Sequence, residues 1–443
     1  MSFDSCRLAD IADVQGGYAF KSADFGSAGV AVVKIANIQP PNVTLDSADR
    51  VEQHKLEGLA RFELADGDIL MAMTGATVGK VARFRKTERA FLNQRVARIS
   101  AKGGPEFNDF IYALVSLPGF DKQIENAAAG SAQANISAAG IGAVAIPSLG
   151  RDAQLVIGSI ARSIDDRITL LRETNTTLEA IAQSLFKSWF VDFDPVRAKA
   201  EGRQPEGMDA ATATLFPDSF EETELGLVPK GWEVKTVGDV VNVTDYVANG
   251  SFAALKENVT LLDQRSYALY VRTTDHNSGF SGGFRYVDKA AYEFLSKSSL
   301  LGNEVIISNV GDVGTVFRPP RWLGIPMTLG SNAVALKAPR MSAFLFFHFS
   351  GAKGQHDIHS VVTGSAQLKF NKTNFRSLKL LLPNESCLSE FEEKASLLLE
   401  ASDNNRAKIE TLTQLRDTLL PRLISGQLRL PEAQAMVENA YVV

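Results

Sequence analysis

Cysteine, long apolar runs and a secretory leader are missing from this chain. The 443 residues include only two cysteines, Cys6 and Cys387, which rules out a disulfide framework. The longest purely apolar stretches, such as Ala343–Phe347, are far too short to span a bilayer. The first residues, MSFDSCRLADIAD, lack the basic and then apolar regions of a signal peptide. We therefore expect a protein of the reducing cytoplasm, without a membrane partner.

An overall excess of positive charge is also missing. The formal net charge is −5, from 46 basic and 51 acidic side chains, so the chain is no general binder of polyanions. Basic residues nevertheless gather between Lys80 and Arg98, and acidic residues between Asp192 and Glu224. A basic face can coexist with acidic surfaces, so the net charge argues only weakly against DNA binding. The length and the 45% of apolar residues predict several domains with cores of their own.

Complete catalytic motifs are absent from the sequence. Gly75–Lys80 resembles a phosphate-binding loop, but it is one spacer residue short, and Val81 replaces the hydroxyl that would bind Mg²⁺. A glycine-permitted turn between strands is the alternative, which we favour. Asp218 with Glu233 and Lys235 imitates a metal-dependent nuclease, whose carboxylates must converge on a metal. Since Asp218 lies in an acidic stretch and Glu233 opens the second half of the chain, we do not expect a nuclease.

A histidine cluster offers only a weak metal site. His356 and His359 are three residues apart and His348 is nearby, but no cysteine or clear carboxylate completes a ligand set. Surface or core histidines are the favoured interpretation. We therefore expect no catalytic residue, no cofactor site and no metal site in this chain.

Sequence features repeat at a nearly constant offset. The tetrapeptide Gly-Ser-Ala-Gln occurs at Gly130–Gln133 and again at Gly364–Gln367. Further matches lie at the same or nearly the same offset: Gly79 with Gly314, Pro147 with Pro383, and Leu178 with Leu412. Each half has a strand-rich segment with glycine turns and then one long helix. These matches indicate an internal duplication.

The long helix of each half has the spacing of a coiled coil. Seam residues of the first helix, apolar except for Asn175, recur at alternating steps of three and four residues: Ala161, Ile164, Ile168, Leu171, Asn175, Leu178, Ala182, Leu185 and Trp189. Asn175 falls at an a position of this seam. A shift by the offset between the two Gly-Ser-Ala-Gln segments gives a second, more polar seam from Ala395 to Leu423. We expect the two seams to bury each other; the alternative is that each helix only covers its own domain.

Three segments carry a family resemblance. Phe186–Arg197 reads FKSWFVDFDPVR, Leu419–Arg429 reads LLPRLISGQLR, and Pro229–Val234 reads PKGWEV. With these segments the chain resembles the specificity subunit of type I restriction–modification systems. The resemblance covers essentially the whole chain. The segments after each helix are specific to that family, whereas the strand-rich segments are not.

The resemblance implies an α+β fold. Two similar strand-rich target-recognition domains are separated by a pair of long antiparallel, coiled-coil-like helices, in a pseudo-twofold internal repeat. The boundaries that we expect are 1–150 for the first recognition domain, 151–195 for the central helix, 196–230 for a partly extended linker, 231–385 for the second recognition domain, 386–430 for the C-terminal helix and 431–443 for a tail.

The resemblance also implies a function without catalysis. Such a subunit reads a bipartite, asymmetric sequence in double-stranded DNA for two methyltransferase subunits, which restriction–translocase subunits join. S-adenosylmethionine would then belong to the methyltransferase partner, and ATP and Mg²⁺ to the restriction partner. Two alternatives remain: a paired-helix scaffold that binds protein rather than DNA, and an unrecognised enzyme.

The residues that contact DNA must be inferred from their chemistry, because the family offers no fixed base-reading positions. Phosphate contacts position a reader and base-edge contacts give specificity, with amides suited to adenine and guanidinium to guanine. The candidates in the first half are Lys21, Ser22, Thr74, Thr77, Asn93, Gln94, Arg95, Ser131, Gln133 and Asn135, with Lys80, Arg83 and Arg85 on phosphates. The candidates in the second half are Ser251, Ser308, Asn309, Asn332, Ser365, Gln367 and Lys369.

Each group of candidates has an ordinary structural alternative. The repeated Gly-Ser-Ala-Gln segments are equally well explained as turns, and the arginines as solvated charge on a strand edge. Trp189, Phe190 and Phe193 are candidates for docking a methyltransferase partner, with core packing as the alternative.

Overall fold

The computed structural model describes residues 5–128, 135–365 and 367–442. By its packing the chain divides into two compact units. Unit 1 comprises Met1–Leu170 with Lys408–Val443, and unit 2 comprises Leu171–Ala407. The sequence predicted two helical parts, 151–195 and 386–430, that are separate from the recognition domains. In the structure each unit instead includes a segment of both long helices. The reason is that the apolar face of each helix segment is buried within its own unit.

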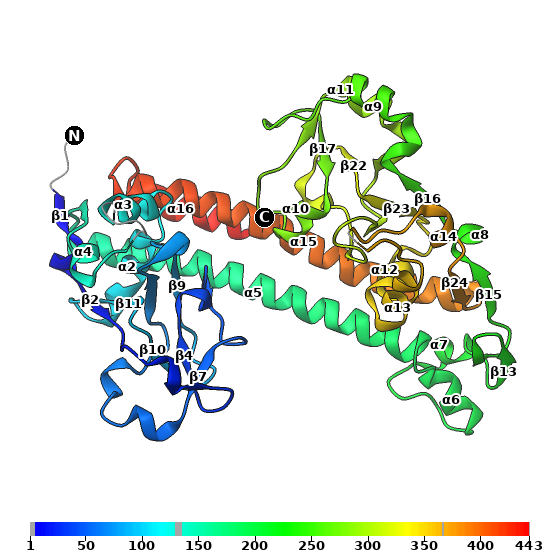
Figure 1. Ribbon diagram of the computed structural model, residues 1–443, viewed down its shortest axis with the longest axis horizontal. Helices are drawn as coiled ribbons and strands as arrows, with labels where there is room; N and C mark the ends of the chain where they lie inside the picture. The colour runs from blue at the N-terminus through cyan, green and yellow to red at the C-terminus, as the bar shows by residue number, and fades with distance from the viewer. Residues whose placement is uncertain (1–4, 129–134, 366, 443) are drawn as a thin grey trace. The chain divides into compact units, whose positions relative to one another are not determined.

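The strand domain of unit 1 is built on two sheets (Figure 1). One has the strand order β2-β11-β8-β9-β6-β5 and the other has the order β10-β4-β7-β3. The strands are β2 (Ala12–Gly16), β3 (Phe25–Gly26), β4 (Val30–Val33), β5 (Ile38–Gln39), β6 (Asn42–Val43), β7 (Asp49–Val51), β8 (Ile69–Ala72), β9 (Val81–Arg83), β10 (Ala90–Leu92) and β11 (Val96–Ala101). Their aliphatic and aromatic side chains, among them Val32, Leu70 and Phe91, form one buried cluster.

Short helices connect this domain to the first long helix. They are α1 (Leu8–Ile11), α2 (Asn108–Val115), α3 (Phe120–Ala127) and α4 (Ala138–Gly142), with a two-stranded pair of β1 (Ser5–Arg7) and β12 (Ala145–Pro147). The long helix α5 (Arg151–Phe190) approaches α2 very closely at Gly158. A Cβ on Gly158 would lie 2.7 Å from the backbone nitrogen of Phe110, so only glycine fits there.

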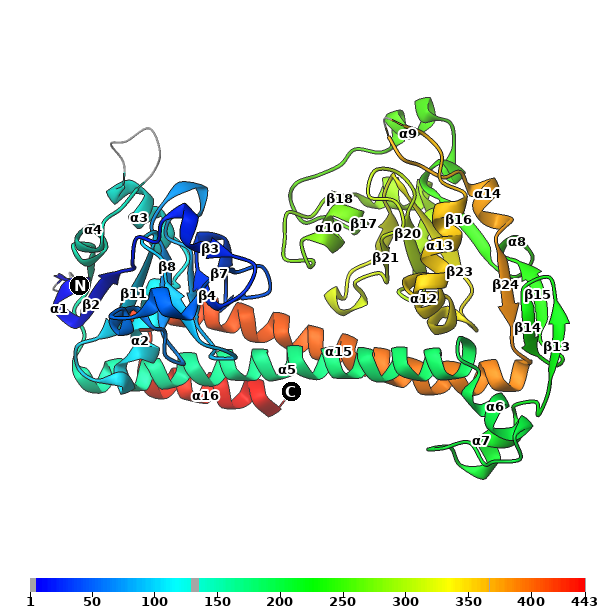
Figure 2. The same cartoon turned by 60° about the horizontal axis from the view of Figure 1, so that its bottom comes forward.

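Unit 2 is built in the same way (Figure 2). Its two main sheets have the orders β16-β23-β20-β21 and β18-β17-β22-β19. The strands are β16 (Asn242–Asp245), β17 (Ala268–Val271), β18 (Tyr286–Val287), β19 (Ser299–Leu300), β20 (Val305–Ser308), β21 (Val316–Phe317), β22 (Met327–Leu329) and β23 (Ala333–Lys337), and a separate pair is formed by β15 (Glu233–Thr236) and β24 (Lys379–Leu382). The helices are α8 (Val237–Val240), α9 (Phe252–Asn258), α10 (Thr273–Asn277), α11 (Lys289–Phe294), α12 (Ser342–Ser350), α13 (Ala352–Ser360) and α14 (Lys372–Arg376).

The order of elements confirms the internal duplication. The parallel pair β4–β10 of unit 1 recurs in unit 2 as the parallel pair β17–β22. The antiparallel pairing of β11 with β2 and β8 recurs as that of β23 with β16 and β20. Helices α2, α3 and α4 have counterparts in α12, α13 and α14, each set followed by a short strand and a long helix.

Residues 196–230 are folded rather than extended. They contain most of α6 (Asp194–Ala200), all of α7 (Ala210–Thr214) and the hairpin of β13 (Phe220–Thr223) with β14 (Gly226–Pro229). Val196 and Phe216 are buried in the core of unit 2. The Pro, Gly and acidic residues suggested a linker because composition does not reveal that a few apolar side chains in the segment find a core.

The two long helices are equal in length and antiparallel. Helix α5 and helix α15 (Glu385–Ile424) each have 40 residues. In unit 2, Phe186 of α5 packs against Phe391 of α15, and further back along α5 Asn175 donates from Nδ2 to the Ser402 carbonyl oxygen, 3.1 Å away. Residue numbers therefore rise along α5 in the direction in which they fall along α15. In unit 1, Arg416 pairs with Asp165 at 2.9 Å.

The predicted seams are largely buried. In unit 1 they include Ala161, Ile164, Ile168, Leu412, Leu419 and Leu423, and in unit 2 Leu171, Ala182, Trp189 and Ala395. The helices also cover their domains, since Phe186 packs against Phe344 of α12 and Gly158 lies against α2. Both interpretations of the heptad pattern therefore hold at once.

The C-terminal segment is helical where the sequence suggested a tail. Gly426, with φ of 67°, follows the end of α15, and Pro431 lies in the first turn of a new helix, α16 (Leu430–Val442). Proline is well tolerated there because the first helical N–H groups have no intrahelical partner. Within the described ranges, no helix has both the length and the apolar character that a bilayer crossing requires. Cys6 and Cys387 are both free thiols.

A pair of asparagines interrupts the apolar seam in unit 2. Asn405 donates from Nδ2 to Asn175 Oδ1 at 2.8 Å, and both side chains are half-buried. Replacing both, as Asn175→Leu with Asn405→Leu, should raise the free energy of unfolding by about 1–2 kcal/mol, because apolar seam residues add buried area and leave no amide unpaired. Asn405→Leu alone should lower it by about 1 kcal/mol, since the Asn175 amide loses a partner.

Urea denaturation measures both effects. Gln183→Leu, at an exposed position of α5, is the control and should change the free energy of unfolding by less than about 0.5 kcal/mol. A double variant that is less stable than Asn405→Leu alone would contradict a seam role for the pair.

The His348 side chain of α12 is half-buried, and its Nε2 is buried without a hydrogen-bond partner among the described residues. Its ring lies nearly parallel to that of Phe344, with ring centroids 6.1 Å apart. Burial lowers the pKa of His348 to about 4, because the charged form would lose its hydration. The folded state therefore binds this proton less readily than the unfolded state, whose histidine has an ordinary pKa of about 6.5.

Unit 2 should lose stability as the pH falls from about 6.5 to 4. A depressed histidine pKa leaves stability intact above the unfolded value and removes it below that value, by about 2 kcal/mol between pH 7.5 and pH 5. Urea denaturation at both pH values measures the loss. His348→Leu should reduce the loss by about that amount, whereas the exposed His54→Leu should not. An equal loss in the His348 variant would assign the pH effect to other groups.

Candidate nucleic-acid interface

One end of the larger sheet in unit 1 collects the loops with predicted DNA contacts. Strand β2 ends at Gly16, β8 ends at Ala72 and β11 begins at Val96, and the registers place these residues beside one another. The loops 17–24, 73–80 and 93–95 therefore leave the sheet at the same end. We call these three loops, together with Asn135, the reading end of unit 1.

Backbone contacts tie the reading end of unit 1 together. The contacts are Met73 N to Arg95 O at 3.0 Å, Ile136 N to Met73 O at 3.0 Å, Gln94 N to Tyr18 O at 2.9 Å, and a bridge between Thr74 and Asn135. Segments far apart in the sequence thus form one surface. Because the main chain makes these contacts, side chains on the surface can differ without changing its shape.

Most of the predicted residues at this end are exposed. The exposed ones are Lys21, Ser22, Lys80, Gln94, Arg95 and Asn135, while Thr74 is half-buried. Gln94 and Arg95 present an amide and a guanidinium at neighbouring positions, the two groups that best match the edges of adenine and guanine.

Two predicted residues of unit 1 point inward. Asn93 is 6% exposed, and its Oδ1 accepts a hydrogen bond of 3.3 Å from the backbone nitrogen of Arg95. The Thr77 hydroxyl is buried and has no hydrogen-bond partner within the described residues. Asn93 therefore shapes the loop that carries Arg95, which a polar residue in a strand-end loop does as often as it contacts a ligand.

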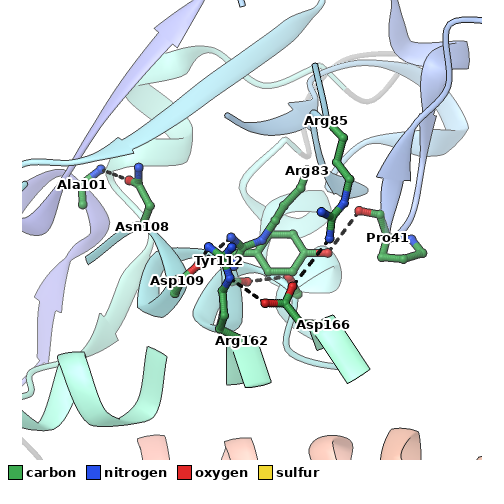
Figure 3. A network of polar contacts seen from close by, with 10 residues as sticks. Pro41, Arg83, Arg85, Ala101, Asn108, Asp109, Tyr112, Arg162 and Asp166 are labelled. Atoms are coloured by element: carbon green, nitrogen blue, oxygen red, sulfur yellow. Dashed lines mark hydrogen bonds and ion pairs between the residues drawn. The ribbon is translucent and has the colours of Figure 1, made fainter. Parts of the chain in front are cut away.

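Arg83 and Arg85 both pair with carboxylates of unit 1 (Figure 3). Arg83 Nη1 lies 2.6 Å from Asp109 Oδ1, and its guanidinium stacks over the Tyr112 ring at 4.2 Å. Arg85 Nη2 lies 3.6 Å from Asp166 Oδ1 of α5. The fold supplies carboxylates that the linear sequence does not place beside these two arginines. Their contacts with phosphates stay a prediction, which the half-exposed Arg85 fits better than the largely buried Arg83.

The rest of the basic stretch is also partly neutralised. Arg89 pairs with Glu63 at 2.8 Å, which lowers the pKa of that carboxyl, and Arg98 pairs with Asp68 at 3.3 Å. The exposed cations between Lys80 and Arg98 that have no ion pair in the described part of the chain are Lys80, Lys86 and Arg95. Two of these three belong to the reading end of unit 1.

Unit 2 has a reading end with the same backbone contacts. The contacts are Asn309 N to Asn332 O at 3.0 Å, Phe370 N to Asn309 O at 3.1 Å, and a bridge between Val310 and Lys369. Strand β16 ends at Asp245, β20 ends at Ser308 and β23 begins at Ala333, again side by side. We define the reading end of unit 2 as residues 246–251, 309–315, 330–332, 363–365 and 367–369.

The predicted residues of unit 2 divide between surface and support. Asn332, with φ of 68°, is exposed, and so are Ser251, Ser365, Gln367 and Lys369. Ser251 also caps α9 by accepting from the Ala254 backbone nitrogen at 3.3 Å. Ser308 is 1% exposed, and the side-chain oxygen of Asn309 is buried without a hydrogen-bond partner in the described ranges. These last two support the loops.

A chain of tyrosines holds loop 330–332 in place. The Tyr270 hydroxyl accepts from the Ser331 backbone nitrogen at 2.8 Å, and the Tyr246 and Tyr270 rings meet edge to face at 5.7 Å. Burial and the neighbouring tyrosine raise the pKa of Tyr246 to about 12, so the hydroxyl stays neutral. The loop that carries Asn332 is thereby fixed before any ligand binds.

Sequence reasoning missed two apolar residues of the reading ends. Tyr18 is 37% exposed and pairs with Asn93 in a parallel bridge. Leu368 is 50% exposed between Gln367 and Lys369. Only polar side chains were predicted to contact DNA, and a single exposed apolar residue in a loop is common on protein surfaces and gives no functional signal by itself. Ser131 and Gln133, which were also predicted, lie outside the described residues.

The three patterns that imitate catalytic or metal sites have structural places. Gly75–Lys80 is the turn between β8 and β9, with Gly79 at φ of 83° against the backbone of Asp121, in line with the favoured interpretation. Glu233 lies in β15 and forms an ion pair with Lys235 at 2.6 Å. His359 Nδ1 lies 2.7 Å from the Gln355 carbonyl oxygen. Across residues 5–128, 135–365 and 367–442, no group of three potential metal ligands occurs.

The aromatic residues predicted for partner docking are mainly core. Trp189 and Phe190 are 3% and 9% exposed and pack against Phe391. Phe193 is half-buried at the end of the helix, with φ of 55°. This packing fits the alternative of core residues, and a docking role for the three aromatic residues stays a prediction. Trp189 does line an open pocket of about 680 Å³, together with Leu185, Arg197 and Lys394.

Known proteins resemble the chain over both repeats. Residues 2–180 and 229–412 match the family described as the type I restriction modification DNA specificity domain. The chain is 27% identical over 334 residues to the specificity subunit of the type I restriction enzyme HindI from Haemophilus influenzae, covering 63% of this chain and 68% of that protein. It is 24% identical over 347 residues to the MjaIX specificity subunit from Methanocaldococcus jannaschii, covering 77% and 73%.

A solved structure shares the fold. The S subunit of a type I restriction–modification system from M. genitalium superposes with a TM-score of 0.56 at 15% identity, covering 95% of this chain and 96% of that chain. The two segments matched by the family include both strand domains and most of both long helices, well over half of the chain. This chain therefore belongs to the family of type I restriction–modification DNA specificity domain proteins.

Proposed function

We propose that the chain is the DNA-recognition subunit of a type I restriction–modification complex, and that it reads a bipartite, asymmetric sequence. The observation that carries this proposal is the repeated reading end. Two sets of loops are held by equivalent backbone hydrogen bonds, and each set presents polar side chains to solvent. A shared scaffold with variable side chains is what two readers of different half-sites require.

The side chains at equivalent positions differ between the two reading ends. Arg95 and Asn332 occupy corresponding loops. The Arg95 carbonyl oxygen accepts a hydrogen bond from the backbone nitrogen of Met73, directly after β8. The Asn332 carbonyl oxygen accepts one from the backbone nitrogen of Asn309, directly after β20. Asn135 corresponds in the same way to Lys369, by the bridges to Thr74 and Val310. Guanidinium and amide groups prefer different base edges, so the two half-sites should differ in sequence.

Catalysis belongs to partners in this proposal. Methyltransferase subunits would supply S-adenosylmethionine chemistry on adenine, and restriction subunits would use ATP and Mg²⁺. The chain would contribute recognition and placement. The pocket beside Trp189 and the exposed apolar residues Ile181 and Leu397, which are 50% and 63% exposed in unit 2, are our candidates for methyltransferase docking.

Arg95→Ala should weaken binding to the cognate DNA by about 5- to 150-fold and relax base preference within one half-site only, because a guanidinium on a base edge contributes about 1–3 kcal/mol of discrimination. The measurement is binding of the assembled complex to a DNA library randomised at each half-site. Arg7→Ala is the matched control, since Arg7 lies on β1, on the side of β2 away from the reading end.

Equal loss at all sequences would instead make Arg95 a phosphate contact. Wild-type protein that binds DNA with no sequence preference at any salt concentration would favour the alternative of a paired-helix scaffold for proteins.

Exchange of residues 231–385 for the corresponding segment of another family member should change one half-site and leave the other intact. The exchanged segment includes both β15 and β24, which pair with each other, so the sheet edge moves as a whole. Sequencing of methylated sites in cells that carry the hybrid gives the readout. A change in both half-sites would contradict the assignment of one half-site to each unit.

A further inference from the structure

The strand domain of unit 2 is joined to its long helix by a buried ion pair. Arg318 Nη2 lies 3.2 Å from Asp403 Oδ2, and the two side chains are only 13% and 10% exposed. Arg318 directly follows β21, and Asp403 lies on α15. Such a pair repays the loss of hydration only when its geometry is well defined, so it resists rotation of the domain on the helix.

Further contacts surround this pair. Arg321 Nη1 lies 3.8 Å from Glu400 Oε1, about one turn along α15 from Asp403. The Arg406 guanidinium lies over the Trp322 ring at 4.7 Å. Three successive contacts along one helix face thus hold the segment that follows β21.

Unit 1 holds its own segment of α5 with a chain of alternating charges (Figure 3). Asp109 of α2 accepts from Arg83 at 2.6 Å and lies 3.4 Å from Arg162 of α5. Arg162 also bonds Asp166 at 3.0 Å, and Asp166 pairs with Arg85 beyond β9 at 3.6 Å. The close approach of α5 to α2 at Gly158 lies one helical turn away.

The two sets of ion pairs, around Arg318 in unit 2 and around Arg83 in unit 1, occupy equivalent places in the duplicated chain. Arg83 is the last residue of β9, which pairs with β8, and Arg318 directly follows β21, which pairs with β20. The offset between these two arginines is the same as that between Gly79 and Gly314. Asp166 and Glu400, which pair with Arg85 and Arg321, are separated by the same offset as the two Gly-Ser-Ala-Gln segments. The loops of the reading ends have diverged, whereas this connection between strand and helix has been kept in both halves.

We propose that Arg318 with Asp403, and Arg83 with Asp109 and Arg162, are positioning residues that fix the angle of each reading end on its own long-helix segment. They act through the reading ends and do not touch DNA. The proposal rests on the proposed function. It states that these charged residues determine how much variation in the length of the DNA spacer between the half-sites the complex tolerates. A reading end that is free to tilt accepts its half-site at more than one spacing.

The test varies spacer length and half-site sequence separately. The full chain carrying Asp403→Asn, assembled with the methyltransferase subunits of its host, binds DNA libraries with spacers one or two base pairs longer or shorter. The preference for the parental spacer over its neighbours should fall about tenfold. A domain that can tilt on its helix reaches a shifted half-site without the DNA having to deform. The base preferences of both half-sites should stay unchanged.

A second variant guards against misfolding. Arg318→Met with Asp403→Leu removes both charges at similar volume, which buried pairs often tolerate, and it should broaden spacer tolerance in the same way. Asp275→Asn is the matched control: Asp275 is 1% exposed and pairs with Arg272, three residues away in the same strand domain. It should lower stability and leave the spacer preference intact.

An unchanged spacer preference in both folded variants would overturn the inference, and so would an equal broadening in Asp275→Asn, since general destabilisation would then explain it. If the wild-type assembly shows no sequence preference at all, the proposed function fails instead. The measurement on the wild-type assembly therefore distinguishes failure of this inference from failure of the proposed function.

Discussion

Burial of the apolar seams of two long helices is the constraint on which both units depend. Each of the two helices has 40 residues and an apolar stripe, and most helical stability in proteins comes from packing of such a face. In each unit a segment of α5 meets a segment of α15, and the strand domain covers the remaining apolar face. The Phe186, Phe344 and Phe391 cluster shows the arrangement within unit 2: one ring from α5, one from the domain and one from α15.

Duplication separates what must stay from what can vary. Strand pairing, the short helices before each long helix and the charges that join domain to helix occur in both halves. The loops at the reading ends share their main-chain hydrogen bonds and a turn glycine, Gly79 or Gly314, while their exposed polar side chains differ. Because those bonds make no demand on side chains, Arg95 and Asn332 can occupy equivalent loops and select different ligands. The same scaffold then supports two specificities within one chain.

Periodic and repeated features of the sequence predicted the fold well. The seam from Ala161 to Trp189, the repeat offset and the order of strands and helix are confirmed, since each follows from spacing alone. Partners in space could not be predicted. Arg83 and Arg85 look like free cations in the sequence, and only the tertiary fold brings Asp109 and Asp166 to them. Residues 196–230 resemble a linker, yet Val196 and Phe216 reach a core whose other members lie far along the chain.

The division of the chain has a consequence for its synthesis. Unit 2 is one continuous stretch, Leu171–Ala407, whereas unit 1 needs Lys408–Val443 in addition to Met1–Leu170. On the ribosome, the strand domain of unit 1 emerges first and can cover one face of its α5 segment, but the seam of that segment stays uncovered until the last part of α15 appears. Unit 2 can close earlier, although it begins later. The part made first is thus the last to be completed, and a nascent chain passes through a stage in which the apolar face of Ile157, Ile164 and Ile168 is open to chaperones.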